Sequence, residues 1–311
     1  MSRSQKEIEA VSAAGNGADA GSKPKWHLKD LRDPMRVFFM GEYMSRTLDV
    51  LDFYETLTLT VHFPFLGQRF FKPIVNLYGE QYHSGRATPL RDVIPLIHEA
   101  KSMAVSECGC RVRSGACNHS TRTCLKINTG AEVELTKGQL KSERITNDEA
   151  VRIVEQAYKD GLLLSVEWCV EPNTYCICCC CSCCCVSHKL RYERDIKSGI
   201  MSSEYLPRFD EKACSGCGRC EEVCPGKAIS VSNGARTVNE DLCVGCGLCE
   251  YHCAAGAIEL VEAREATAAK DNNWFHYLIV YISILLVLAP YFFVYMTIKR
   301  NHRERAREIE W

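Results

Sequence analysis

The sequence has no excess of charge of either sign, because 38 lysines and arginines stand against 39 aspartates and glutamates. A formal net charge of −1 gives no bulk attraction to nucleic acid, so we expect no nucleic-acid partner. The first 25 residues contain no apolar segment of the kind that directs export. The chain also lacks a Rossmann fingerprint, a P-loop and a flavin motif, which excludes the common nucleotide cofactor sites.

Cysteine, by contrast, is abundant: the chain has 21 cysteines, and eight of them fall within the ten positions 176–185. A disulfide scaffold requires an exported chain, and the sequence shows no export signal, so we expect these thiols to be reduced. Reduced cysteines at tight, regular spacing are most often ligands of metal ions or clusters. The sequence therefore predicts a metalloprotein.

The strongest motif is C-x2-C-x2-C-x3-C, which occurs at residues 214–224 and again 29 positions later at 243–253. Three thiolates on a tight loop can bind three irons of one cubane, while the fourth cysteine, which we expect to start a helix, reaches the other cubane. Gly216, Gly218, Gly245 and Gly247 let the backbone approach the clusters. The predicted cluster ligands are Cys214, Cys217, Cys220 and Cys253 for one cubane, and Cys243, Cys246, Cys249 and Cys224 for the other.

This motif pair resembles the bacterial two-cluster 4Fe-4S ferredoxins over roughly Pro207 to Val261. The resemblance implies a small repeat of hairpins and short helices, with two 4Fe-4S clusters forming much of its core. The second copy departs from the pattern by carrying Ala254 where the first has Pro225, which affects the turn more than the ligands. Structural zinc sites also use paired C-x2-C motifs, but the three-residue gap before each last cysteine favours the crossed cubanes.

Apart from the isolated Cys169, twelve cysteines precede this region, and all twelve are candidate metal ligands. They are Cys108, Cys110, Cys117, Cys124, Cys176, Cys178, Cys179, Cys180, Cys181, Cys183, Cys184 and Cys185. Neighbouring residues of an extended chain project to opposite sides, so one cubane can use only alternate members of the run. Two centres on opposite faces, one centre with spare thiols, and a cluster shared between the two groups are all geometrically reasonable.

The front half is similar to poorly characterised iron-sulfur proteins of anaerobic microbes, which share a C-x-C-R start, a later C-L and a dense cysteine run. That resemblance implies one or two further iron-sulfur clusters but no reaction. Cations among the first cysteines are expected to offset thiolate charge, namely Arg111, Arg113, Arg122 and Lys126. His119 and His188 are candidate ligands, although a histidine near cysteines more often forms a hydrogen bond or lies at the surface.

Three segments carry clear secondary-structure signals. The alternation in TLTLTVHF, residues 56–63, predicts a strand, and a helix is expected to start near Pro95. A second helix is expected after Thr146, which forms a capping box with Glu149, and it should stop at Gly161.

Residues 275–298 form an uncharged, largely apolar run of the length that spans a bilayer, for which ~20 residues are needed. The predicted fold class is therefore α+β, with a cysteine-rich head, a ferredoxin-like module and one C-terminal transmembrane helix. The predicted segments are a disordered lead-in at 1–25, a cysteine-rich domain at 26–206, a dicluster domain at 207–262, the span at 275–298 and a basic tail at 299–311.

These features favour a membrane-anchored electron carrier that passes single electrons to or from a membrane redox complex. At its other end the carrier would exchange electrons with a soluble donor or acceptor, since the chain has no nucleotide site of its own. The basic tail favours a cytoplasmic C-terminus. The absence of a twin-arginine signal outweighs this and favours a cytoplasmic head. The alternative is a reductase that uses a catalytic cluster or a vicinal thiol pair within residues 176–185; we predict no catalytic residue by name.

Overall fold

The computed structural model describes residues 44–59, 67, 69, 72–169, 174–232 and 235–264. We call the described residues up to 204 the head and residues 205–264 the module. The head contains η2 (Met44–Arg46), α4 (Thr47–Leu59), α5 (Lys72–Tyr82), β1 (His83–Ala87), α6 (Leu90–Glu99), β2 (Met103–Glu107), α7 (Gly109–Ser114), β3 (Arg122–Ile127), α8 (Thr129–Lys137), β4 (Ser142–Ile145), α9 (Asn147–Lys159), β5 (Leu163–Cys169), β6 (Thr174–Cys180), α10 (Val186–Tyr192) and η5 (Lys197–Gly199). The module contains β7 (Tyr205–Phe209), α11 (Arg219–Glu222), β8 (Ile229–Ser232), β9 (Ala235–Val238), α12 (Leu248–Tyr251) and β10 (Ile258–Glu262).

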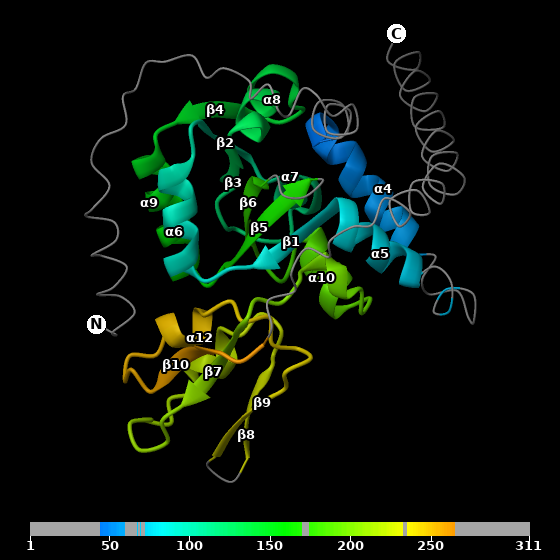
Figure 1. Ribbon diagram of the computed structural model, residues 1–311. Coiled ribbons are helices and arrows are strands. Elements are labelled where there is room, and N and C mark those ends of the chain that lie inside the picture. Colours follow the sequence, from blue (N-terminus) through cyan, green and yellow to red (C-terminus); the bar gives the residue numbers. More distant parts are fainter. Residues whose placement is uncertain are drawn as a thin grey trace.

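The head is built on a six-stranded antiparallel sheet with the order β1-β5-β6-β3-β2-β4. Helices α6 and α9 cover one face of this sheet (Figure 1). Their apolar sides bury Ile94, Ile97 and Val154 against Leu125 and Ile177, which are paired on the central strands. Because side chains alternate along a strand, the residues between these apolar ones lie on the opposite face.

Helices α4 and α10 lie on the other side of the sheet (Figure 1). Helix α4 contacts α7 and α10, and α8 packs against strands β2, β3 and β6. This second face carries Cys124 of β3 and Cys176 and Cys178 of β6. The fold therefore separates an apolar core on one face from a thiol-rich layer on the other.

Helix α9 confirms the predicted cap. The Thr146 side chain accepts a hydrogen bond of 3.2 Å from the backbone amide of Glu149, and Gly161 follows the helix with a φ of +79°. The predicted start of a helix near Pro95 is wrong, because α6 already begins at Leu90 and Pro95 lies inside it. Pro95 is exposed there, so its ring does not meet the core.

The strand predicted at residues 56–63 is also wrong, since 56–59 complete helix α4; residues 60–63 lie outside the described residues. Alternating threonine and leucine favour a strand only weakly, and tertiary contacts override such a preference.

The module pairs β7 with β10 and β8 with β9, both antiparallel. Each short helix starts after a glycine with positive φ, Gly218 at +75° and Gly247 at +79°, a conformation that a side chain would strain. The helices carry the third cysteine of each motif, Cys220 and Cys249, and end before the fourth. The expectation that the fourth cysteine starts a helix is therefore wrong.

The two halves of the module differ in their contact with the head. Val244, Cys246 and Leu248 of the second half are buried within the same apolar cluster as the helices of the head. The Tyr158 hydroxyl donates a buried hydrogen bond of 2.7 Å to the carbonyl of Cys246. In the first half, Cys217 is exposed. The module thus docks through its second motif.

The fold class needs one correction. No helix in the described ranges is long and apolar enough to cross a membrane, and α4 and α9 have only 13 residues each. The expected C-terminal transmembrane helix is therefore not part of the fold class, which is α+β with a cysteine-rich head. The run 275–298 itself lies outside the described residues.

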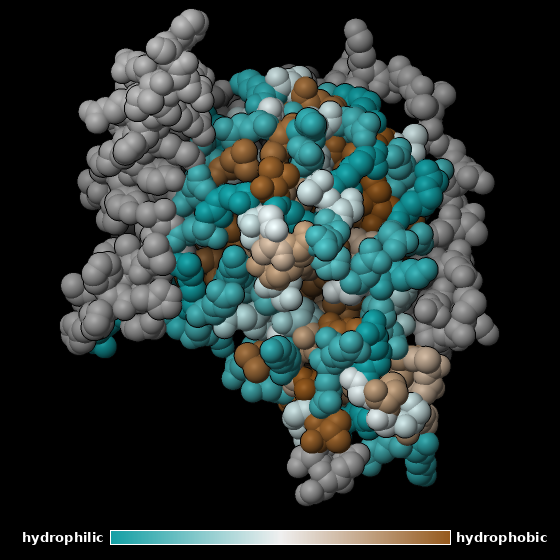
Figure 2. All heavy atoms as spheres, turned by 180° about the vertical axis from the view of Figure 1, so that it is seen from behind, coloured by the Kyte–Doolittle hydropathy of each residue, from teal (hydrophilic) through white to brown (hydrophobic). Residues whose placement is uncertain are grey.

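The described surface is mixed in polarity. In the view from behind, hydrophilic residues separate small hydrophobic areas on the coloured part of the molecule (Figure 2). Leu96, Val112, Val231 and Leu242 are exposed apolar side chains from different elements. Single exposed apolar residues of this kind are ordinary in folded proteins.

Candidate functional site

The second motif of the module surrounds a cavity. Cys224, Cys243, Cys246 and Cys249 all line this space. These are the four cysteines that the crossed arrangement assigns to one cubane. Burial, followed by the nearby thiolates of Cys224 and Cys243, raises the pKa of Cys246 to about 12. Four thiolates around one space, two of them buried, repel one another unless a cation lies among them, so this donor set fits an iron cluster.

The first motif forms a more exposed site. Cys214, Cys217 and Cys220 lie close enough to Arg236 of β9 to raise the pKa of its guanidinium, with a contact to Cys220 as the largest cause. The fourth thiol, Cys253, accepts a hydrogen bond of 3.3 Å from the amide of Ala257.

The two motifs of the module meet at their fourth cysteines. The Cys224 thiol accepts a bond of 3.2 Å from Ala228, which matches the bond from Ala257 to Cys253 in the other half. Both fourth cysteines pack with Cys220 and Cys249 in one small cluster. The two sites are therefore neighbours.

Comparison with known proteins agrees with this geometry. Residues 213–258 match the family model of a 4Fe-4S dicluster domain. No curated protein and no solved structure shows significant similarity to the chain. The chain therefore carries a 4Fe-4S ferredoxin-like module. None of these comparisons matches the head. The number of clusters and each ligand assignment stay predictions.

In the head, strand β6 divides the cysteine run by face. Ile177 lies in the core beneath α6 and α9, whereas Cys176, Cys178 and Cys180 lie on the other face, as alternation predicts. The Cys176 sulfur is 3.5 Å from Cys124 on the neighbouring strand and 3.5 Å from Cys178. The structure thus brings the two groups of front-half cysteines together, which was one of the three arrangements left open by the sequence.

These thiols border a second cavity, of about 740 Å³, between the sheet and helix α4. Seven cysteines belong to it through their side-chain contacts with one another: Cys108, Cys110, Cys124, Cys176, Cys178, Cys180 and Cys185. Thr47, Val50 and Leu51 of α4 line the opposite wall. We call this space the head cavity.

A buried charged residue, Lys126, lines the head cavity. Lys126 is buried 3.7 Å from Glu134; although burial opposes it, the nearby Cys124 and Cys176 thiolates hold the pKa of Lys126 well above its usual value. Contacts from Cys176 and Cys178 lower the pKa of Cys124. A fixed cation beside thiols favours their ionised form, which is the form that binds metal.

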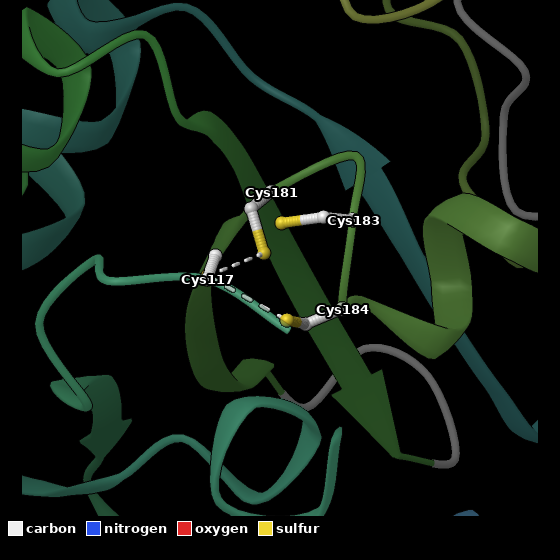
Figure 3. Close-up of side chains that lie close together, drawn as sticks. All are labelled: Cys117, Cys181, Cys183 and Cys184. Atoms are coloured by element: carbon white, nitrogen blue, oxygen red, sulfur yellow. Dashed lines mark hydrogen bonds between the residues drawn. The ribbon is translucent and has the colours of Figure 1, made fainter. Parts of the chain in front are cut away.

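The remaining thiols form a group at the edge of the head. Cys117, Cys181, Cys183 and Cys184 place all four sulfurs within 4.8 Å of one another (Figure 3). Cys117 precedes β3, and the other three occupy the turn between β6 and α10. Cys179 belongs to the apolar core, and nothing is described of the Cys169 side chain.

The cations and histidines that the sequence singled out lie in different surroundings in the structure. Arg111 and Lys126 are buried beside the thiols, as expected. Arg113 instead pairs with Asp52 and Glu55 of α4, and Arg122 pairs with Glu143 and Glu149. His188 is bound through Nε2 to the carbonyl of Pro225 at 3.0 Å, and His119 contacts Cys117 through its backbone amide.

The sequence analysis missed three groups of the site. Glu167 lines the head cavity, and Tyr158 and Tyr192 contact the second motif of the module. Only Glu167 left a signal, as an acidic residue in the otherwise largely apolar strand LLSVEWC. The two tyrosines sit on helices of the head, and their contacts depend on how the module docks.

Arg111 is expected to stabilise the cysteine-rich layer strongly. Its guanidinium donates to the carbonyls of Ser120 and Cys179, both at 2.6 Å, and to the Thr123 hydroxyl at 2.5 Å. Arg111→Ala should lower the free energy of unfolding by about 3 kcal/mol, because buried acceptors lose a charged donor. Urea denaturation of the purified protein measures this change.

Arg113→Ala is the matched control on the same helix. Arg113 forms part-exposed ion pairs, for which less than ~1 kcal/mol is expected. Equal losses from the two variants would contradict the role given to Arg111.

Proposed function

We propose that this protein transfers single electrons between the ferredoxin-like module and one further iron-sulfur cluster held in the head cavity. Bound clusters would supply one-electron transfer with little rearrangement of the protein. The observation that carries the proposal is helix α10, which joins the two cysteine sites. The chain's own residues fix the position, burial and charge of each site.

Helix α10 begins at one site and ends at the other. Cys185 is its N-cap, and contacts from the Cys110 and Cys180 thiols lower the pKa of Cys185 to about 5. Tyr192, at the last turn, lines the cavity of the second motif. Seven residues of helix span about 10 Å, at ~1.5 Å per residue. Electron transfer falls off steeply with distance, so a short, rigid connection favours it.

Further contacts hold α10 against the module. The Tyr192 hydroxyl donates to the carbonyl of Leu242 at 3.1 Å, and Arg191 donates to the carbonyl of Asp241 at 2.8 Å. Both acceptors directly precede Cys243. These bonds restrain the separation of the two sites, which a mobile linker would not do.

The two motifs differ in exposure, and this difference determines which motif lies at the surface end of the proposed electron path. Cys217 of the first motif is exposed, whereas Cys246 and Cys249 are buried against the head. A redox partner would therefore approach the first motif, and electrons would reach the head cavity through the second. The partner must carry the donor or acceptor cofactor, since the sequence has no nicotinamide or flavin motif.

Metal analysis with a redox titration tests this proposal on the full chain, purified without oxygen. We expect about twelve irons and as much sulfide per chain, corresponding to three 4Fe-4S clusters. Cys176→Ser should remove about four irons, because it deletes a thiol from the middle of the head cavity. The control Ile177→Val, in the apolar core on the opposite face of the same strand, should keep all of them. Each centre should titrate as a one-electron couple in spin-resonance spectra.

The outcome that contradicts the proposal is about eight irons in the wild-type protein, all from the module. The same conclusion follows if Cys176→Ser leaves the iron count unchanged.

A second candidate function is reduction of a small substrate in the head cavity. The observation that favours it is the surplus of thiols: nine cysteines line the cavity, and a cubane takes four. Two spare thiols can cycle between dithiol and disulfide, which is a two-electron step. A two-electron wave in the same titration, absent from Cys176→Ser, would favour the reductase over the carrier.

A further inference from the structure

The group at the edge of the head differs from the cluster sites in its spacing. The Cys117 sulfur lies 4.0 Å from that of Cys181 and 3.5 Å from that of Cys184. In Figure 3 the sulfurs of the 181–184 turn point toward the side where Cys117 lies. We call Cys117, Cys181, Cys183 and Cys184 the edge quartet.

We propose that the edge quartet binds one tetrahedral divalent ion, zinc or iron, separate from any iron-sulfur cluster. A tetrahedral ion with metal-sulfur bonds of about 2.3 Å holds its sulfurs about 3.8 Å apart. The observed separations of 3.5 and 4.0 Å bracket that value. These two separations match a single-ion site, and all four sulfurs lie within 4.8 Å of one another.

A cubane requires wider spacing, because each thiolate binds a different iron and the sulfurs point away from one another. The module provides an internal comparison: none of its cysteines, all of them described, belongs to a group with all sulfurs within 4.8 Å. The cysteines that match the 4Fe-4S family model are thus spaced more widely than the edge quartet.

Space also separates the edge quartet from the head cavity. Of its four residues, only Cys181 lines that cavity. Cys124, Cys176 and Cys178 are as close together as the quartet, but all three line the head cavity, where further thiols are available for a larger group.

The surroundings of the edge quartet suit thiolates. The guanidinium of Arg111 is buried and contacts the Cys181 thiol. Four thiolates around a divalent ion carry two negative charges, which Arg111 partly offsets. Cys183 is exposed, so an ion can enter from solvent.

Such an ion would join two distant parts of the chain. Residues 115–121, between α7 and β3, form no helix or strand, and Cys117 is 64 positions from Cys181. Binding would anchor this loop to the end of β6, at the rim of the head cavity. Metal ligation of this kind contributes directly to folding stability.

The test is metal analysis of full-length wild-type protein and of Cys117→Ser, Cys183→Ser and Ser182→Ala, all purified without oxygen. Wild type should hold one ion beyond the iron that is matched by sulfide. Zinc would show four sulfurs at about 2.3 Å in X-ray absorption, and iron would show a high-spin ferrous Mössbauer doublet distinct from the clusters, which becomes a high-spin ferric signal after one-electron oxidation with added ferricyanide. Either cysteine variant should lose this ion and keep its sulfide, whereas Ser182→Ala, in the same turn, should keep both.

Three results would overturn the inference. They are the absence of an extra ion in the wild type, a disulfide among the four cysteines in anaerobic protein, and a joint loss of iron and sulfide in Cys183→Ser. Because sulfide reports only clusters, failure here leaves the electron-transfer proposal standing, and failure of that proposal leaves this one intact.

Discussion

Replacing Cys246 with serine should remove about four irons and four sulfides per chain and weaken the attachment of the module to the head. Cys246 lies in the cavity of the second motif, and its carbonyl accepts the hydrogen bond from Tyr158. Loss of the cluster would leave the remaining thiols around a void, within an apolar cluster that also includes helices of the head. Unfolding of head and module should therefore shift together to lower temperature.

The matched control is Cys217→Ser, at the equivalent position of the first motif. It should also remove about four irons, but Cys217 is exposed and belongs to no part of the head core. Iron and sulfide assays with thermal unfolding measure both effects. Equal destabilisation of the head by the two variants would contradict the asymmetric docking, and an unchanged iron count would contradict the ligand assignment.

Adding a single methyl group at Gly245 should destabilise the protein nearly as much as replacing Cys246. Gly245 has a φ of +70°, and an added Cβ would meet the Ser203 hydroxyl and lie 2.5 Å from the carbonyl of Tyr205. The positive φ alone costs about 1–2 kcal/mol for a residue with a side chain, and the overlap adds ~1–3 kcal/mol. Gly245→Ala should therefore displace the second motif and lower the yield of its cluster.

Gly216→Ala separates the two contributions. Gly216 is the equivalent residue of the first motif, with a φ of +76°, but no atom lies within 4 Å of an added Cβ. This variant should show only the conformational cost and keep its clusters. Urea denaturation and iron analysis of both proteins provide the comparison, and identical losses would show that contact with the head is unimportant at Gly245.

Local signals in the sequence predicted local features. The cap at Thr146 is found in the structure, and the paired cysteine motifs match the dicluster family model. The sheet order was not predictable, because strand pairing between β3 and β6 joins segments about fifty residues apart. Helix α4 shows the limit of local patterns, since its threonine-leucine end resembles a strand.

The candidate site shows the same contrast between features set by neighbouring residues and features set by distant ones. Cysteine spacing was enough to predict two cubane ligand sets in the module, because each spacing is set by one short loop; the assignment of each ligand stays a prediction. In the head, spacing alone left three arrangements open. Only the pairing of β3 with β6 shows that Cys124 lies beside Cys176 and that Cys117 lies beside the 181–184 turn. The tyrosines of the docking surface left no signal in the sequence.

The unequal exposure of the two motifs also determines where oxygen would damage the protein first. Oxygen and its reduced products would reach the cysteines around Cys217 first, while those around Cys246 are shielded by the head. Along the proposed electron path, a molecule damaged in this way would lose the outermost cluster, and with it the point at which a partner would exchange electrons. Repair would then need to rebuild only that cluster.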